Sequence, residues 1–324
     1  MALLPLPLMA NEHEEGGELN IPEIVLHHLA DAYEWHIVGD VSIPLPIIIR
    51  SEATGEWHFC TEHSLPDGFF FNEEAHGKIY EQMADGTSVR PLDLSITRNV
   101  LQLWIVVAVL LVVFLSCARW YKKRDKTSPA PKGFVGAVEM LVMMINDDVI
   151  KANIGEKHYR KYAPYLLTVF FFIFVTNLLG LLPIFPGGSN VTGNINITFF
   201  LAVNLFGNRE YWKEIFWPDV PIFLKAIPIM PAIELFGVFT KPFALMIRLF
   251  ANMMAGHAMI LAFTCVIFLG WTLGAAMGAG LNIFSAIMLL FMNGLELLVA
   301  FVQAYVFTML SAVFIGLAHK EHHG

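Results

Sequence analysis

The sequence predicts an all-α polytopic membrane protein with about five membrane helices, two of them long and tilted, behind a small α+β N-terminal domain. Of its 324 residues, 56% are hydrophobic and only 15% are charged, whereas soluble domains carry roughly 25% charged residues. Residues 1–97 hold 17 acidic and 3 basic side chains, and residues 98–324 hold 11 acidic and 17 basic ones. This composition excludes a soluble enzyme. The N-terminal part is acidic and the membrane part is basic, and this difference helps to predict which side of the membrane each end occupies.

The first 97 residues divide into an apolar start and a polar domain. Residues 1–10 are apolar and uncharged; we interpret them as the remainder of a signal peptide whose start is mis-assigned, with an apolar terminus as the alternative. Residues 11–97 predict the periplasmic α+β domain. From periodicity and β-branched content, its expected elements are a short helix over Ile21–Tyr33, a strand over Trp35–Arg50 that Pro44 and Pro46 interrupt, and a second strand over Glu56–Cys60.

Histidine and cysteine do not indicate a metal centre. Seven of the 12 histidines lie in residues 11–97, but their spacing fits no metal signature, so we expect solvated or pH-tuning side chains. The 3 cysteines are far apart and form no disulfide framework. We therefore expect no cofactor, no metal and no nucleic-acid partner.

The first membrane span is expected over residues 99–118, a run of 20 residues without charge. A helix of that length spans about 30 Å, the thickness of one bilayer core. Residues 119–126 (RWYKKRDK) then bring five basic and two aromatic side chains. Because basic residues accumulate on the cytoplasmic side, the N-terminal domain is expected outside, in the periplasm of a bacterium.

An amphipathic helix is expected after a linker at residues 127–132. In residues 134–150, apolar side chains recur at helical spacing, opposite Asn146, Asp147 and Lys151. This pattern favours a helix on the cytoplasmic surface of the membrane. The alternative, a soluble core helix, has too little soluble chain to pack against.

Two apolar stretches follow. Residues 162–185 predict the second span, in which Asn177 is the one strongly polar side chain and Pro183 marks the end. Residues 195–206 are apolar for 12 residues, about 18 Å of helix. They form either a truncated span or a span that extends into residues 207–213, so the topology of this part stays open.

The last two apolar stretches are unusually long. Residues 227–270 and 275–317 contain 44 and 43 residues, about 65 Å each as helices. Each is either a hairpin of two helices or one long tilted helix. Neither contains a polar turn, so we expect two long tilted helices joined by the Gly-rich segment 270–280. The membrane domain then covers residues 98–324, with the C-terminus in the cytoplasm.

The first long stretch carries ionisable groups in apolar surroundings. Glu234, Lys241 and Arg248 are seven residues apart and share a helix face, which Asn252 joins, whereas His257 lies about 180° round the helix. An arginine cannot lose its proton, and at the bilayer centre it costs about 2.5–3.5 kcal/mol. Arg248 is therefore a candidate functional residue that needs a partner; the alternative is an arginine that snorkels from a helix end.

The second long stretch offers Glu296 and Gln303 on one face. Antiparallel packing would bring His257 near Glu296 and Arg248 near Gln303. Histidine titrates near neutrality, so His257 with Glu296 is a candidate proton relay; the alternative is a buried pair that only holds the helices together. Since Glu296 is better placed for His257, the acid that pairs with Arg248 is expected on a partner subunit.

Residues 248–257 (RLFANMMAGH) resemble the core motif of subunit a of the rotary F-type ATP synthase, R-L-F-x-N-x-x-A-G followed by Glu or His. The resemblance covers about residues 95–320, and its motifs are specific in combination. The other motifs that fit this family are Lys241 with Pro242, Glu234, residues 303–307 (QAYVF) and residues 176–183 (TNLLGLLP).

The resemblance implies a proton-translocating stator subunit, a channel subunit rather than an enzyme on its own. Arg248 would face the carboxylates of the rotating c-ring and separate two aqueous half-channels. In some family members the acid and the histidine of the relay stand on the opposite helices. The other implied positions are the periplasmic half-channel for His257 and Glu296, the hand-over to the ring for Asn252 and Gln303, and the cytoplasmic exit for Glu234, with Lys241 and Asn177 as secondary positions.

The resemblance also implies the c-ring, peripheral-stalk subunit b and lipid as partners, the proton as the translocated ion with sodium as the alternative, and the bacterial cell inner membrane as the location. The residues themselves leave two other function classes open. One is a membrane-embedded enzyme with a metal or acid–base site at Glu296 and histidines, whose dense cluster is residues 319–323. The other is a stand-alone ion transporter, for which inverted repeats are expected and none is found.

Overall fold

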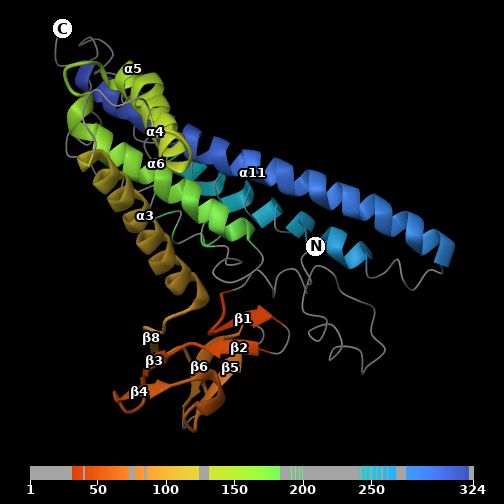
Figure 1. Cartoon of the computed structure of the whole chain (residues 1–324). Coiled ribbons are helices and arrows are strands. Elements are labelled where there is room, and N and C mark those ends of the chain that lie inside the picture. Colours follow the sequence, from red (N-terminus) through yellow and green to blue (C-terminus); the bar gives the residue numbers. More distant parts are fainter. Residues whose placement is uncertain are drawn as a thin grey trace, which may run out of the picture. The chain divides into compact units, whose positions relative to one another are not determined.

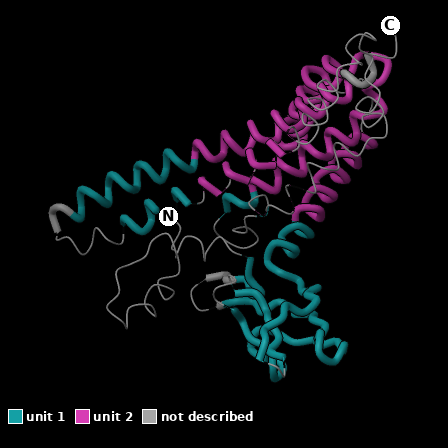
Figure 2. The backbone as a smooth tube through the Cα atoms, turned by 180° about the vertical axis from the view of Figure 1, so that it is seen from behind, with its two compact units in different colours: residues 1–105, 179–191, 257–293 teal, residues 106–178, 192–256, 294–324 magenta. Residues whose placement is uncertain are grey.

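The chain forms two compact units, each assembled from segments that are distant in sequence (Figure 2). Unit 1 contains residues 1–105, 179–191 and 257–293, and unit 2 contains residues 106–178, 192–256 and 294–324. This computed structural model describes residues 31–38, 41–72, 77–83, 86–123, 131–182, 191, 194, 197, 199, 240, 243–244, 246–248, 250–252, 254–256, 258–260, 262–267 and 275–320.

Unit 1 contains short antiparallel strands in three sheets, ordered β1–β2, β4–β3–β8 and β5–β6–β7. They confirm the strand content expected of the N-terminal domain, while the helix expected over Ile21–Tyr33 lies almost entirely outside the described residues. The elements are β1 (Glu34–Val38), β2 (Val41–Pro44), β3 (Ile47–Arg50), β4 (Trp57–Cys60), the 3-10 helix η2 (Glu62–Ser64), β5 (Phe69–Asn72), β6 (Lys78–Gln82), β7 (Ser88–Val89) and β8 (Leu92–Asp93) (Figure 1).

Residues 35–50 form three strands rather than one interrupted strand. β1 and β2 pair antiparallel with Val38 opposite Val41, so the chain reverses between these residues. The sequence there is glycine followed by aspartate, residue types that favour turns and that the β-branched pattern around them obscured. β3 begins at Ile47, beyond the predicted interruption, and pairs with β4, as expected for the second strand.

The core of this domain is a small cluster of buried hydrophobic side chains. Ile47, Ile49 and Ile79 are almost completely buried, and Tyr33 packs with them. The Tyr33 hydroxyl donates a 2.5 Å hydrogen bond to Asp93. Burial, and then the Asp93 carboxylate, raise the pKa of Tyr33 well above its ordinary value, because both disfavour a phenolate at this position.

The domain joins the first long helix, α3 (Arg98–Lys122), without a flexible linker. The backbone N–H of Arg98 donates to the carbonyl of Ala32 at 3.0 Å. The next N–H, of Asn99, donates to the Asp31 carboxylate at 3.2 Å. The first N–H groups of a helix lack intrahelical partners, so residues of the domain supply the cap of α3.

The described residues that follow β8 are mostly helical (Figure 1). Among the described residues, four helices are long and apolar enough to cross a membrane: α3, α6, a helix over Met246–Ile267, and Gly278–Gly316 of α11. α3 and α6 run over the two spans expected first, whereas residues 195–206 are mostly outside the described residues. The bounds are α4 (Phe134–Met144), the π-helix η3 (Ile145–Lys151), α5 (Ala152–Ile154), α6 (Tyr159–Leu181) and α11 (Ala275–Lys320).

α11 is one continuous helix of 46 residues. It would be about 69 Å long at 1.5 Å per residue, roughly twice the thickness of a bilayer core. The alternative of a helical hairpin in this stretch is therefore wrong. The sequence predicted that the Gly-rich segment 270–280 joins the two long helices, but residues 275–280 already belong to α11, so this part of the prediction is wrong. Residues 270–274 lie outside the described residues.

The core of unit 2 brings α6 and the end of α11 together around aromatic rings. Phe170 stacks on Phe174 with ring centroids 5.9 Å apart, and Phe301 of α11 meets both rings edge-on at 6.1 and 5.9 Å. α3 joins through Phe114, whose ring lies 5.0 Å from that of Phe171. Edge-to-face and offset contacts of this kind are favourable beyond the apolar area that they bury.

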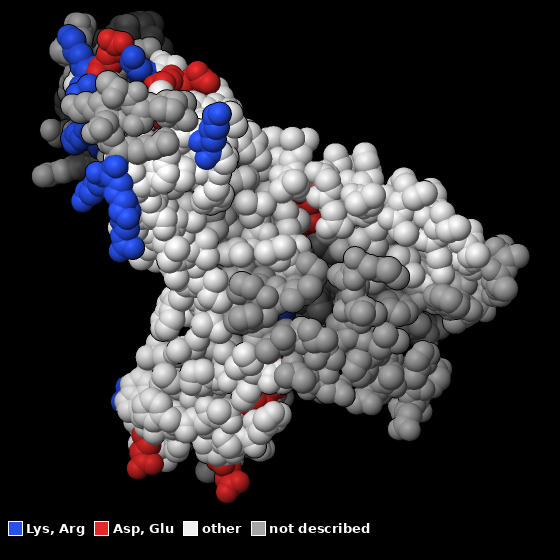
Figure 3. Space-filling model, viewed as in Figure 1, with Lys and Arg blue, Asp and Glu red and all other residues white. Residues whose placement is uncertain are grey.

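The amphipathic helix expected over residues 134–150 continues further and changes its pitch. α4 leads into the π-helix η3 and then α5, and Ile145 and Val149 are buried in the core of unit 2. α5 touches α11 so closely that a Cβ atom at Gly316 would overlap the carbonyl of Asn153. This segment therefore packs on other helices instead of lying on lipid alone. Figure 3 shows charged side chains gathered at this end of the unit.

We expect Tyr33→Phe to loosen the N-terminal domain. The substitution removes the hydrogen bond to Asp93, and a bond to a charged group stabilises by about 1.5–3 kcal/mol. Hydrogen exchange at neutral pH, read by mass spectrometry on peptides from residues 31–98, should show a lower opening free energy. Tyr80→Phe, on an intermediate-exposure ring of β6, is the matched control, and equal effects of both changes would contradict the assignment.

The same group predicts an alkaline transition. Because the folded-state pKa of Tyr33 is raised, its contribution to stability is complete below the unfolded value of about 10 and is lost as the pH rises through the folded value. Limited proteolysis of the domain should accelerate above about pH 10 in the native chain. In Tyr33→Phe this acceleration should be smaller; an identical pH profile would refute the role of Tyr33.

Candidate functional site

Arg248 lies on the exposed surface of its helix. Its side chain is exposed, and so is that of Asn252, one turn further on. Within the part of the chain that the structure describes, no group forms a hydrogen bond or ion pair with Arg248. Arg248 and Asn252 are four residues apart and are both exposed, which is consistent with the predicted shared helix face.

The surface around Arg248 is apolar and lined with small side chains. Ala244, Ala251 and Ala255 are exposed on the same side of the helix as Arg248. Ile247, 37% exposed, and Phe243, 58% exposed, lie further round the helix. Small residues at helical spacing let the backbone of a second helix approach closely in a membrane. This face can therefore receive an apolar helix with an acidic group opposite the guanidinium.

Glu296 and Gln303 lie on one face of α11, as their spacing predicted, and the structure shows that this face is buried. Each side chain is 6% exposed, and Ala300, Ala304 and Phe307 on the same face are buried as well. Neither carboxylate oxygen of Glu296 has a hydrogen-bond partner among the described residues. Burial of a charged carboxylate without a hydrogen-bond partner costs free energy, so Glu296 is a candidate for a functional role.

Gly256 makes the close contact that positions Glu296. A Cβ atom on Gly256 would lie 2.6 Å from Oε1 and 3.3 Å from Cγ of Glu296, so no larger residue fits without moving the carboxylate. The sequence analysis missed this role. The signal that could have found it is the pair Ala255 and Gly256, small residues that mark close helix packing.

Asn177 is completely buried in α6, next to the buried Thr176. The Thr176 hydroxyl donates a 2.6 Å bond to the carbonyl of Phe172 in the same helix. The hydroxyl of Thr176 is therefore satisfied within its own helix, and Asn177 is the other buried polar side chain in this turn of α6. The described contacts do not bring Asn177 to Arg248 or Glu296, which fits its secondary rank.

Three predicted site residues, Glu234, Lys241 and His257, lie outside the described residues. The register expected between the two long helices places His257 against Glu296; the neighbouring Gly256 does make that contact. Among described residues, Arg248 makes no hydrogen bond with Gln303, since one side chain is exposed and the other buried.

No group of three or more His, Cys, Asp or Glu side chains that could hold a metal ion occurs in the described part of the chain. The side chains of the histidine-rich tail, residues 319–323, fall outside it. The described residues offer groups for acid–base chemistry: one buried carboxyl group on α11 and one exposed permanent cation on a separate helix.

Comparison with known proteins identifies relatives for both parts of the chain. Residues 100–316 match the family model described as ATP synthase A chain, and residues 24–94 match a Domain of unknown function (DUF8433). An ATP synthase subunit a from Chlorobium phaeobacteroides is 45% identical over 71% of this chain and 67% of its own length. One from an Anaeromyxobacter species is 35% identical over 96% of this chain and 73% of its own length.

We expect a disulfide to form between the paired substitutions Gly256→Cys and Glu296→Cys, in a chain whose own cysteines are replaced by serine. A Cβ atom at position 256 would lie 3.3 Å from the Cγ atom of Glu296. Cysteine places its sulfur atom at the γ position, so we expect the two sulfur atoms to come close enough to bond. Mass spectrometry of the oxidised protein detects the linked peptides. The control pairs Gly256→Cys with Leu297→Cys, since Leu297 is 51% exposed; equal linking in both pairs would contradict the register.

Proposed function

The chain belongs to the ATP synthase subunit a family, and we propose that it passes protons between the two sides of the membrane and the carboxylates of the rotating c-ring. As a family member it is a polytopic membrane protein in the stator of an F-type ATP synthase. It is a channel subunit for proton transport in ATP synthesis and not an enzyme on its own. Membership favours this function over a His/Glu enzyme or a stand-alone transporter.

The observation that carries the proposal is that Arg248 is exposed and forms no hydrogen bond or ion pair with any residue that the structure describes. A guanidinium stays charged at any accessible pH, and apolar surroundings make that charge costly. A carboxylate that arrives from another subunit would relieve the cost each time it passes. We place the c-ring carboxylates in this role.

The small side chains around Arg248 support a moving partner. Ala244, Ala251 and Ala255 leave a smooth surface against which a rotor helix can come close. Interlocking large side chains would resist rotation, because packed surfaces hold their partners in one register. The two half-channels then meet this face on either side of Arg248, which keeps protons from crossing without turning the ring.

The periplasmic half-channel is built around Glu296. Its buried carboxyl group, held against Gly256, receives protons with His257 as the other member of the relay. Asn252 and Gln303 stand near the hand-over to the ring. Asn252 is exposed on the ring-facing side and Gln303 is buried one helix away, which suits groups on the two sides of that transfer.

The transport cycle has four steps. A proton enters through His257 and Glu296 and neutralises a c-ring carboxylate. The neutral site turns into lipid, where an uncharged group costs little. The carboxylate that returns from the other side meets Arg248, whose positive charge favours the ionised form. Its proton leaves toward Glu234 and the cytoplasm, with Lys241 and Asn177 in secondary positions.

Orientation follows from the charges at the helix ends. Arg119, Lys122 and Lys123 close α3, and such clusters stay on the cytoplasmic side. The N-terminal domain is then periplasmic, the C-terminus cytoplasmic, and the membrane the bacterial inner membrane. Lipid and peripheral-stalk subunit b are the proposed partners of the faces that the c-ring does not cover.

Arg248→Ala should abolish ATP synthesis driven by a proton gradient, because the returning carboxylate then keeps its proton. The complete complex should still assemble, since the Arg248 side chain is exposed. Synthesis is measured in membrane vesicles and assembly by co-purification of the other subunits. Lys123→Gln, outside the apolar helices, is the control; synthesis at the normal rate in assembled Arg248→Ala would disprove the role of Arg248.

His257→Ala and Glu296→Gln should slow proton flux and change its pH dependence, because each removes one titrating group from the relay. Loss of a positioned proton-transfer group lowers rates by at least about a hundredfold in many enzymes, and a tenfold or larger decrease is expected here. ATP-driven acidification of vesicles, followed over a pH series, measures it. A reduced rate with an unchanged pH profile would point to a purely structural pair.

A further inference from the structure

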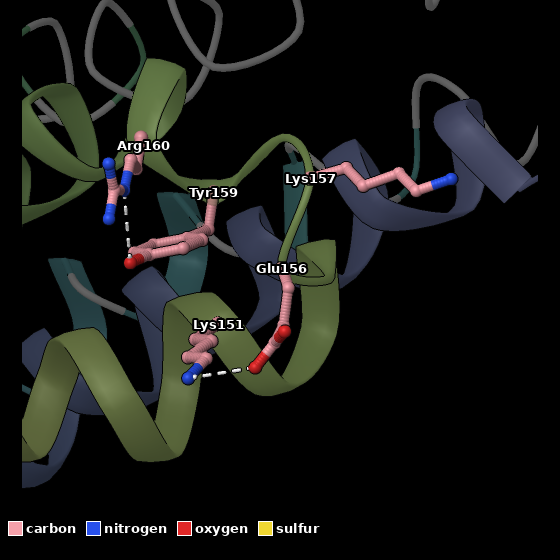
Figure 4. Close-up of a pocket in the computed structure, with 5 residues that line it drawn as sticks. All are labelled: Lys151, Glu156, Lys157, Tyr159 and Arg160. Carbon is pink, nitrogen blue, oxygen red and sulfur yellow. Dashed lines mark hydrogen bonds and ion pairs between the residues drawn. The ribbon is translucent and has the colours of Figure 1, made fainter.

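A charged hollow lies at the junction between α5 and α6, at the end of unit 2 that carries the charged side chains (Figure 3). Its volume is about 450 Å³. The residues that line it are Lys151, Glu156, Lys157, Tyr159 and Arg160 (Figure 4). None of them has a part in the proton path proposed above.

The turn that builds the hollow depends on Gly155. This residue ends α5 with φ 87°, and its N–H donates to the carbonyl of Lys151 at 3.0 Å. A positive φ is strained for other residues, while a Cβ at this position would meet no atom within 4 Å. The carbonyl of Gly155 then accepts the N–H of Tyr159 at 3.1 Å, so the chain returns at once into α6.

The charges of the hollow do not balance. Lys151 pairs with Glu156 at 3.0 Å, which raises the pKa of Lys151. The Nε of Arg160 donates to the Tyr159 hydroxyl at 3.4 Å and not to a carboxylate. Lys157 extends away from the ion pair (Figure 4). Within the described residues, neither Lys157 nor Arg160 pairs with an acid, so the hollow keeps two uncompensated positive charges.

The residues around the hollow are of the types found at a membrane–water boundary. α6 begins at Tyr159 and is long and apolar enough to span a membrane. Lys157, Arg160 and Lys161 lie around Tyr159, and the 42% exposed Tyr165 follows them, a mixture of basic and aromatic side chains that is typical of that boundary. Pro164 and Tyr165 in the first turns of α6 are exposed. A lipid could cover these side chains with its acyl chains, whereas a free anion would not contact them.

We propose that this hollow binds the phosphate of an anionic phospholipid. Arg160 holds the phosphate oxygens, and the Tyr159 hydroxyl is a further donor once Arg160 turns to the lipid. Lys157, whose side chain extends away from Arg160 (Figure 4), turns back to join them when the lipid binds. The acyl chains lie along the exposed side of the first turns of α6. Basic pockets between membrane helices bind such headgroups in general, and nothing in this proposal depends on the path of the proton.

The test uses the complete, purified ATP synthase in nanodiscs of phosphatidylcholine. One sample contains photoreactive phosphatidylglycerol and the other photoreactive phosphatidylcholine, and mass spectrometry maps the labelled peptides. The anionic probe should label residues 151–165 more strongly than the zwitterionic probe, by roughly fivefold for each unpaired basic residue. Equal labelling by the two headgroups would overturn the proposal.

Matched variants separate the hollow from general surface charge. Lys157→Gln and Arg160→Gln should each lower anionic labelling by roughly fivefold. Glu156→Gln should raise it, because it frees Lys151 from its ion pair. Lys132→Gln changes the net charge by the same amount outside the hollow and should have no effect. A decrease in the Lys132→Gln control as large as in Arg160→Gln would refute a specific site.

Two further outcomes identify a different occupant and would also refute the lipid. Millimolar inorganic phosphate that removes the labelling would indicate a site for free phosphate. A zero-length cross-link from Lys157 to an acidic peptide of another subunit, without lipid label, would indicate a protein interface. Co-purification of all subunits checks assembly, and the single Lys157→Gln variant remains available if Arg160→Gln fails to assemble.

Discussion

An ion in apolar surroundings needs a partner, and this constraint orders the helical part of the chain. Among the described residues of unit 2, most Lys and Arg side chains lie at or just beyond helix ends, such as Lys122, Lys157 and Arg160. Two ionisable groups depart from that arrangement among the described residues of the long helices. Glu296 is buried against the backbone of Gly256 and can become neutral by taking up a proton, whereas Arg248 cannot. The permanent charge is accordingly the one on the surface, where another molecule can meet it.

Much of the fold could be predicted from runs and periods of residue type. The uncharged run after Arg98 and the unbroken apolar stretch after Ala275 each became a single helix. The hairpin before Pro44 was missed because β-branched residues on both sides of a glycine–aspartate pair look like one strand. The π-helix Ile145–Lys151 was also missed, since its period is set by packing on neighbouring helices and is not encoded in hydrophobic spacing.

The candidate site was predictable in its residues and less so in its geometry. Spacing of seven placed Glu296 with Gln303 on one face, and both are buried. Spacing cannot tell which face meets lipid, a rotor or another helix, so the exposure of Arg248 and the burial of Glu296 came only with the structure. The role of Gly256 was missed for a different reason. Its lack of a side chain leaves the space that the Glu296 carboxyl group occupies.

The cap of α3 has a mechanical consequence. Its first N–H groups are held by Ala32 and Asp31 of the strand domain, and the preceding N–H of Ile96 is held by the carbonyl of Pro46. A helix tethered by one flexible strand of chain could spin about its own axis. Because several backbone N–H groups at the start of α3 are hydrogen-bonded to the strand domain, this end of the helix cannot rotate freely about its own axis. The first turn of α3 can therefore unwind only when the strand domain releases these hydrogen bonds, so the stability of the domain also protects the start of the helix.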